Sequence, residues 1–398
     1  MNDATIYLDH NATTPIDPRV IEAMASAWKD IGANPASQHA AGRKTRRVLE
    51  ECREGILTLL SGRTGGMEAD RLIFTSGGTE ANNLALLGVG RDSVARPAAT
   101  ESRPTIISAI EHPSIQGAAD ELARRGHPVI RLPVNRDGIT DVAALQSQLP
   151  NPKSQILPRL VSVMLANNET GVIQPVKELA AICHAHNVQL HTDAVQAVGK
   201  IPVSFQDLGV AAMTVAPHKF HGPLGIGALV VRHDVQLQPL LFGGFQQASL
   251  RPGTECVPLT VGFFTALKRY HDEADERQRR MTSLRDKLEE LLLAGAPDAV
   301  IIGARAPRLP QSTNIAFPGL NRQALVMALD MAGVACSTGS ACASGSSEPS
   351  PALVAMGLEK RLIEGSIRLS LGAFTAAAIV DEAARRILKC VNHLRQHK

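Results

Sequence analysis

A cysteine lies at the centre of a stretch of small polar residues. Residues 337–347 read Ser-Thr-Gly-Ser-Ala-Cys-Ala-Ser-Gly-Ser-Ser, with Cys342 in the middle. Such residues bury too little apolar surface to hold one conformation, so we expect a mobile loop. A thiol on a mobile loop could reach into a pocket, collect a chemical group and carry it out again. The alternative is a linker that happens to contain a cysteine.

Three further polar stretches could supply the rest of an active site. Residues 76–80, Ser-Gly-Gly-Thr-Glu, follow a strand-like segment and open a helical one, so their backbone N–H groups would favour an anion such as phosphate. Asp193 ends another strand-like segment, where open α/β sheets bind ligands, although it could equally cap the segment that follows. Lys219 ends a third, beside His218, and could be a Schiff-base amine or a surface lysine.

Together these groups match the needs of pyridoxal phosphate. That cofactor requires a lysine for its aldehyde, a carboxylate to keep its ring nitrogen protonated and a helix N-terminus for its phosphate. Glu111-His112 follows the strand-like residues 105–110 and supplies an imidazole that could stack on the ring. The sequence therefore predicts a pyridoxal phosphate site.

Some histidines and cysteines have spacings that metal ligands also use. We expect no resident metal, because no second motif supplies carboxylate or thiolate ligands beside them. The groups concerned are His218 with His221, and Cys183 with His184, His186 and His191.

The composition is that of an ordinary globular enzyme. Of the 398 residues, 44% are hydrophobic and 20% charged, and the formal net charge of +3 is too small to favour nucleic acid. No apolar run reaches the roughly 18 residues that a membrane span needs, and the first residues show no secretory signal. The six cysteines are scattered without a Cys-x-x-Cys pair, which favours reduced thiols in the cytoplasm.

Strand-like and helix-like segments alternate along the chain. This alternation predicts an α/β fold with a mostly parallel sheet and helices on both faces. The length fits a large domain, residues 16–258, and a smaller α+β domain made of residues 1–15 and 259–398. Helix patterns begin at Asp17-Pro18 and cover 40–61, 79–87 and 258–296; strand patterns cover 71–76, 105–110, 128–132, 159–165, 188–193, 211–216, 226–231 and 367–371.

Several ordered motifs resemble those of one known family almost end to end. They are Tyr7-Leu-Asp-His-Asn-Ala-Thr-Thr-Pro15, Phe74-Thr-Ser-Gly-Gly-Thr-Glu80, Glu111-His112, Asn167-Asn-Glu-Thr-Gly171, Asp193-Ala-Val-Gln196, His218-Lys219, Arg251-Pro-Gly-Thr254, Ser340-Ala-Cys342 and Ser366-Ile-Arg368. The chain is similar to the cysteine desulfurases of fold type I, in the class V aminotransferase group. This resemblance implies a large domain built on a mostly parallel sheet of seven strands.

The resemblance also implies a reaction. Lys219 would hold the cofactor and then act as general base on the substrate Cα. Cys342, as a thiolate, would attack the sulfur of bound L-cysteine, alanine would leave, and the enzyme would keep a persulfide. Lys219, Cys342 and His112 would be the catalytic residues.

The implied contacts divide between cofactor and substrate. Arg368 would bind the substrate carboxylate in a bidentate pair, with Asn168 and Asn11 beside it. Thr254 would reach the cofactor phosphate from a second subunit, so a homodimer is implied. The implied cofactor contacts are Asp193 to the ring nitrogen, Gln196 to the phenolic oxygen, His112 stacked on the ring, Gly78, Thr79 and His218 at the phosphate, and Asn168 and Lys219.

The long form of the Cys342 loop resembles a subgroup that feeds iron–sulfur scaffolds and thiolation enzymes. A sulfur-acceptor protein is therefore an implied partner, and Cys342 would contact an iron–sulfur cluster only transiently, on that partner. Iron–sulfur assembly, transfer-RNA thiolation and DNA phosphorothioation all stay open as destinations. We expect no direct binding to nucleic acid or membrane.

The chain departs from the family pattern in three places. Ala216 stands where relatives usually carry a serine, Leu224 replaces a common lysine, and residues 243–249 lack a usual glutamate and arginine. Cys336 could be a resolving thiol for Cys342 or a bystander. Two alternatives to a cysteine desulfurase stay open: a related lyase or aminotransferase, such as one preferring selenocysteine, and a cofactor-free paralogue that docks on a sulfur-handling complex.

Overall fold

A seven-stranded sheet organises the computed structural model, which describes residues 5–89, 103–149, 157–339 and 348–397. Its strand order is β2-β8-β7-β6-β5-β3-β4, and every pair is parallel except those that β8 makes with β2 and β7. The predicted mostly parallel sheet is confirmed. Its strands are β2 Arg71–Thr75, β3 Thr105–Ser108, β4 Val129–Leu132, β5 Leu160–Ser162, β6 Leu190–Asp193, β7 Ala212–Val215 and β8 Gly227–Val231.

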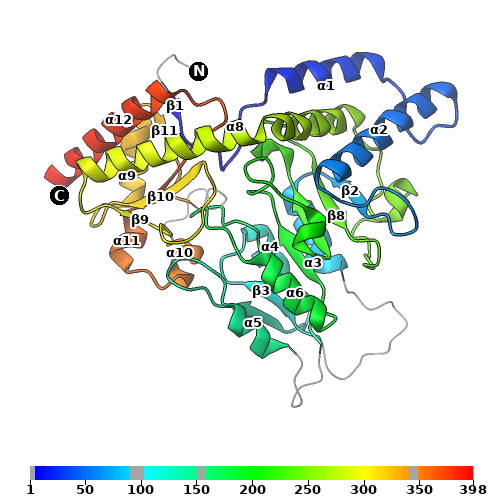
Figure 1. Ribbon diagram of the computed structural model, residues 1–398, viewed down its shortest axis with the longest axis horizontal. Helices are drawn as coiled ribbons and strands as arrows, with labels where there is room; N and C mark the ends of the chain where they lie inside the picture. Colours follow the sequence, from blue (N-terminus) through cyan, green and yellow to red (C-terminus); the bar gives the residue numbers. More distant parts are fainter. Residues whose placement is uncertain (1–4, 90–102, 150–156, 340–347, 398) are drawn as a thin grey trace.

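Helices cover both faces of this sheet, as predicted (Figure 1). Alternate strand residues point to opposite faces, so Ile73 packs on one side while Leu72 and Phe74 pack on the other. The Ile73 side is covered by α3 Gly78–Gly88 and α4 Pro113–Arg124. The opposite core includes residues of α1 Pro18–Asp30, α2 Ala40–Leu59, α5 Val142–Gln148, α6 Val176–Ala185 and α7 Phe205–Leu208.

A second group of strands and helices includes both ends of the chain. β10 Ser312–Ala316 pairs antiparallel with β9 Val300–Ile301 and β12 Ser366–Ser370, and β1 Ile6–Tyr7 pairs parallel with β11 Val334–Ala335. The first residues of the chain are thus paired with a strand of its last third. The helices here are α9 Arg322–Met331, α10 Pro351–Ala355, α11 Lys360–Glu364 and α12 Ala377–Gln396.

The long helix α8, Val257–Gly295, runs between the two groups (Figure 1). Its first half packs Phe263 and Leu267 on the core of the large sheet, and its second half packs Leu288 and Leu292 on the other core. The helix belongs to both cores, and the domain boundary at residue 258 stays a prediction. Within the described part of the chain, no helix combines the length and apolar character that crossing a membrane requires.

One prediction concerns the point where β8 passes the start of α3. A Cβ added to Gly227 would lie 2.5 Å from the carbonyl carbon of Gly77, closer than packed atoms can approach. Gly227→Ala should therefore lower the free energy of unfolding by about 1–3 kcal/mol, the usual range for overpacking. Gly65→Ala, with nothing within 4 Å of its new Cβ, is the matched control. Equal urea midpoints for the two variants would contradict this packing.

Candidate active site

A pocket of about 730 Å³ opens at the carboxyl ends of β6 and β7, where α/β sheets bind ligands. Ten of the twelve predicted site residues line it. Thr254 is exposed and does not line the pocket of its own chain, and Cys342 lies outside the described residues. The ten are Asn11, Gly78, Thr79, His112, Asn168, Asp193, Gln196, His218, Lys219 and Arg368.

Asp193 ends β6 with only 6% of its surface exposed. Its Oδ1 accepts a hydrogen bond from the backbone N–H of Val195 at 2.9 Å, so it also caps the following turn. Its Oδ2 accepts from Asn82 Nδ2 at 2.7 Å. Asn82 is a residue that the motif analysis did not single out. It lies three positions after Thr79 on the same helix face, which is the signal that could have found it.

Lys219 ends the 3₁₀ turn η1, Pro217–Lys219, directly after β7. Its Nζ donates to the backbone carbonyls of Asn11 and Ala12, each at 2.7 Å. Gln196 Nε2 donates to the same Asn11 carbonyl at 3.0 Å. The N-terminal segment therefore forms one wall of the pocket, although some two hundred residues separate it from the lysine.

Two imidazoles in the pocket have low pKa values. Burial holds the pKa of His112 below its usual value, although Asp193 opposes the shift. Burial, followed by the charges of Lys219 and Lys200, lowers the pKa of His218 to about 4. Both rings are therefore neutral at pH 7. His112 also caps α4 through a 3.2 Å bond from the N–H of Ser114 to Nδ1.

The first turn of α3 can receive a phosphate. Among the described residues no side chain caps this helix, because its N-cap is Gly77. Glu80 accepts from the N–H of Ser76 at 2.7 Å and from Arg251 Nε at 2.8 Å, which connects two of the predicted motifs. Burial raises the pKa of Glu80, but these bonds outweigh it and leave the pKa below normal. The open helix end and the nearby carboxylate of Asp193 fit a phosphorylated pyridine cofactor.

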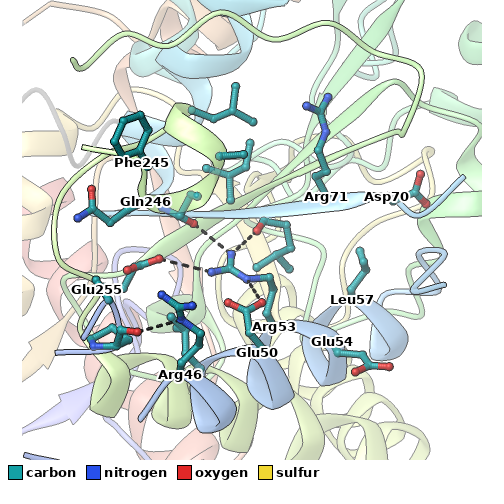
Figure 2. A pocket seen from close by; sticks show the side chains of 18 of the residues that line it. Arg46, Glu50, Arg53, Glu54, Leu57, Asp70, Arg71, Phe245, Gln246 and Glu255 are labelled. Atoms are coloured by element: carbon teal, nitrogen blue, oxygen red, sulfur yellow. Dashed lines mark hydrogen bonds and ion pairs between the residues drawn. The ribbon is translucent and has the colours of Figure 1, made fainter. Parts of the chain in front are cut away.

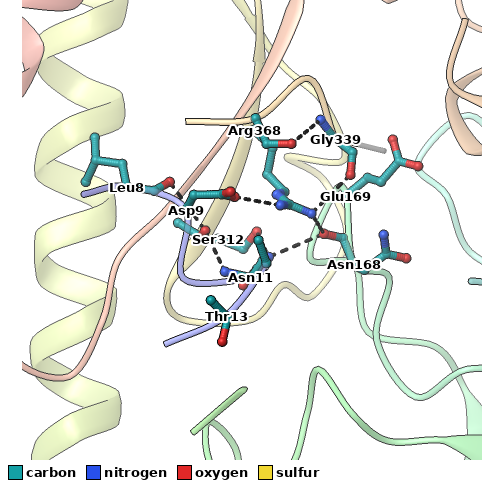
Figure 3. Close-up of polar contacts among 12 residues, drawn as sticks. Leu8, Asp9, Asn11, Thr13, Asn168, Glu169, Ser312, Gly339 and Arg368 are labelled. Atoms are coloured by element: carbon teal, nitrogen blue, oxygen red, sulfur yellow. Dashed lines mark hydrogen bonds and ion pairs between the residues drawn. The ribbon is translucent and has the colours of Figure 1, made fainter. Parts of the chain in front are cut away.

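Arg368, on β12, lines the pocket and is almost completely buried (Figure 3). Its Nη2 forms a 2.7 Å ion pair with Asp9 Oδ1, and its Nη1 donates at 3.0 Å to the carbonyls of Asn168 and Gly339. Within the described chain its Nε has no hydrogen-bond partner. A carboxylate ligand would satisfy this donor. Asp9 lies in the motif at residues 7–15, where the sequence alone gives no sign that it pairs with Arg368.

Glu111 is a buried acid on the pocket wall. Burial raises its pKa to about 8, although bonds from Ser108 Oγ and the N–H of Met164 oppose the shift. The neighbouring Asp193 raises it further. Glu111 is therefore largely protonated at pH 7.

The three departures from the family pattern lie in different surroundings. Ala216 is buried on the pocket wall and offers no hydroxyl, whereas Leu224 is exposed. Residues 244–248 of the third departure line a separate cleft of about 880 Å³ beside α2 and β2 (Figure 2). There the Gln247 amide pairs with the backbone of Phe74: Oε1 accepts from its N–H at 2.7 Å, and Nε2 donates to its carbonyl at 2.9 Å.

Cys336 shows no sign of an activated thiol. Burial raises its pKa to about 12, and the charge of Asp9 adds to the shift. A thiol with such a pKa is protonated at pH 7 and reacts slowly. These properties favour a bystander over a resolving thiol.

The histidines with metal-like spacing make other contacts. His191 lies between Ser162 Oγ and Thr214 Oγ1, at 2.9 and 3.0 Å, and His221 Nδ1 contacts the carbonyl of Pro15 at 2.8 Å. Throughout the described ranges, no three or more His, Cys, Asp or Glu side chains form a group suited to a metal ion.

Comparisons with known proteins agree with this geometry. The family model "Aminotransferase class-V" matches residues 6–382. A Mycobacterium tuberculosis protein named "IscS-like cysteine desulfurase" is 42% identical over 379 residues, which are 95% of this chain and 94% of the relative. The solved structure of a NifS-like protein from Rickettsia africae is 31% identical with a TM-score of 0.86, covering 98% of this chain and 99% of that one.

A second solved structure, "SspA in complex with cysteine", is 28% identical with a TM-score of 0.78 and covers 94% of this chain and all of that chain. The residues matched by the family model include members of both hydrophobic cores and all the motifs identified in the sequence. The chain belongs to the cysteine desulfurases of the class-V aminotransferase family.

Proposed function

We propose that the pocket around Lys219 binds pyridoxal phosphate and L-cysteine, and that the sulfur passes to Cys342 as a persulfide while L-alanine is released. The class-V aminotransferases and the cysteine desulfurases depend on pyridoxal phosphate. The main support is one juxtaposition: Lys219, Asp193 and the open N-terminus of α3 all face the same pocket. The solved relative in complex with cysteine supports the substrate.

The cofactor contacts in this proposal are those of the pocket wall. The backbone of Gly78 and Thr79 would hold the phosphate with His218, and Asp193 would keep the ring nitrogen protonated. His112, neutral at pH 7, would cover the ring face, and Gln196 would donate to the phenolic oxygen. When bound, the cofactor supplies an electron sink for the substrate Cα.

Arg368 would receive the substrate carboxylate. Its unpartnered Nε and its exchangeable ion pair with Asp9 give a planar guanidinium that can turn from an internal carboxylate to an external one. Asn11 and Asn168 lie beside it, since Asn11 Nδ2 donates to the Asn168 carbonyl at 3.4 Å. Because Lys219 and Arg368 line the same pocket, the amine of Lys219 would move the Cα proton of a substrate held in this way.

The thiolate of Cys342 would be the nucleophile of the sulfur step. It attacks the substrate sulfur, an S–S bond forms, and the electron pair of the broken carbon–sulfur bond stays with the carbon skeleton. Protonation of that carbon and of Cα gives alanine, so atoms and electrons balance without an external oxidant. A second subunit would contribute Thr254, which is exposed on its own chain. A sulfur-acceptor protein in the cytoplasm would then take the persulfide sulfur.

Lys219→Ala tests the anchoring of the cofactor. The purified variant should be colourless and inactive, because no other amine lines the pocket among the described residues. Lys177→Ala, an exposed lysine on α6, should stay yellow and active. Absorbance spectra and alanine release measure both. Full activity in the Lys219 variant would exclude it as the anchoring lysine.

Cys342→Ser tests the persulfide. The yellow wild-type enzyme, given L-cysteine and a reductant, should release sulfide and alanine in equal amounts. The serine variant should keep its colour and lose nearly all sulfide release, whereas Cys336→Ser should behave as wild type because that thiol is protonated. Sulfide release that persists without Cys342 would refute the persulfide step, and a wild type that stays colourless with added cofactor would indicate a non-catalytic paralogue.

Arg368→Lys tests the substrate carboxylate contact. A lysine cannot form the planar bidentate pair, so the variant should lose a charged hydrogen bond of about 1.5–3 kcal/mol. This corresponds to a roughly 10- to 100-fold fall in kcat/KM for L-cysteine, with the visible colour kept. Arg361→Lys, an exposed arginine on α11, is the control. Unchanged kinetics in the Arg368 variant would place the carboxylate elsewhere.

A further inference from the structure

A buried lysine lies directly behind the pocket wall. Lys200 is 3% exposed and does not line the pocket itself. Its Nζ donates to Gln196 Oε1 at 3.0 Å, from one turn further along the segment that follows β6. In the part of the chain that the structure describes, no carboxylate lies within ion-pair distance of this amine. Burial, followed by the charges of Lys219 and Arg368, lowers the pKa of Lys200 well below its usual value.

A lysine in this position carries a cost that packing alone does not explain. An amine removed from water without a carboxylate partner is destabilising, and an apolar side chain of similar length would fill the same space without that penalty. Within the described structure, the side chain that accepts a hydrogen bond from this amine is Gln196. The contact with Gln196 is therefore where a function for Lys200 should be sought.

That contact decides which way the amide faces. An amide can present either its oxygen or its NH2 group to a site, and its partners determine which one. Because Lys200 supplies N–H donors, the amide oxygen faces Lys200, and Nε2 faces the Asn11 carbonyl at 3.0 Å. The same carbonyl accepts from Lys219 Nζ at 2.7 Å, so the NH2 group of Gln196 is held beside the amine that would anchor the cofactor.

We propose that Lys200 is a positioning residue that fixes the Gln196 amide with its NH2 group toward the phenolic oxygen of pyridoxal phosphate. The inference rests on the proposed function and deepens it. Without Lys200 only the Asn11 carbonyl still orients the amide, so the amide can leave the orientation that donates to the phenolic oxygen, and that hydrogen bond is lost. Lys200 also lowers the pKa values of three histidines, His10, His218 and His221. Burial is the largest cause of these low pKa values, so the three rings are neutral at pH 7 and do not compete for the amide oxygen.

A double-mutant cycle with pyridoxal phosphate as the probe tests this arrangement. Lys200→Met should weaken cofactor binding about tenfold and shift the visible absorption band, because one hydrogen bond to the phenolic oxygen is lost. In a Gln196→Ala background the same change should add little to either effect, since the amide through which Lys200 acts is gone. Lys177→Met, at an exposed position, is the control and should match wild type.

Additive effects on affinity and on the band would overturn the inference, because Lys200 would then act without Gln196. If Lys200→Met does not fold, Gln196→Glu takes its place. This variant gives Lys200 a carboxylate partner but removes the NH2 donor, so thermal stability should hold while the band shifts and affinity falls. Wild-type affinity and spectrum in Gln196→Glu would overturn the inference alone, whereas a wild-type enzyme that binds no cofactor would overturn the proposed function with it.

Discussion

Three basic side chains, two of them buried and Lys219 half-buried, lie around one pocket, and the rest of the site supplies them with acceptors. Arg368 forms an ion pair with Asp9, Lys200 donates to the Gln196 amide oxygen, and Lys219 donates to the carbonyls of Asn11 and Ala12. Backbone carbonyls and one amide oxygen accept the hydrogen bonds of the two lysine amines. Such oxygens accept hydrogen bonds from a basic group without adding a full negative charge, which leaves the pocket suited to anionic groups such as a phosphate or a carboxylate.

The acceptors come from parts of the chain that the fold must bring together. The carbonyls of Asn11 and Ala12 belong to the N-terminal segment, which β1 fixes beside β11. The Gly339 carbonyl comes from the last third of the chain, and Asn168 from the loop after β5. The site is therefore assembled only when both cores are formed, so its geometry depends on the packing of α8 against each of them.

The sheet, its strands and most of the pocket residues were predictable because their signals are local. Buried parallel strands show as short apolar runs, and catalytic groups follow the strand ends, so Asp193 and Lys219 can be located from sequence. Asp9 and Lys200 could not be located in this way. The Asp9–Arg368 pair joins residues 359 positions apart, and nothing near Lys200 in the sequence indicates that its side chain turns inward. A contact between residues far apart in the sequence produces no periodic pattern of residue types in a single chain.

The pairing of Gln247 with Phe74 also determines how this molecule can meet others. β2 is the outer strand of the large sheet, and an outer strand normally offers its free backbone groups to any extended peptide. Here a side-chain amide occupies both groups of Phe74, and Arg53 donates to the neighbouring carbonyl of Leu72 at 2.6 Å. The sheet cannot grow by strand addition at this edge, which guards against aggregation. Any association at this edge must therefore use side chains. Two large apolar side chains close to Gln247 in sequence are available for it: Phe242 is 83% exposed and Phe245 is 91% exposed.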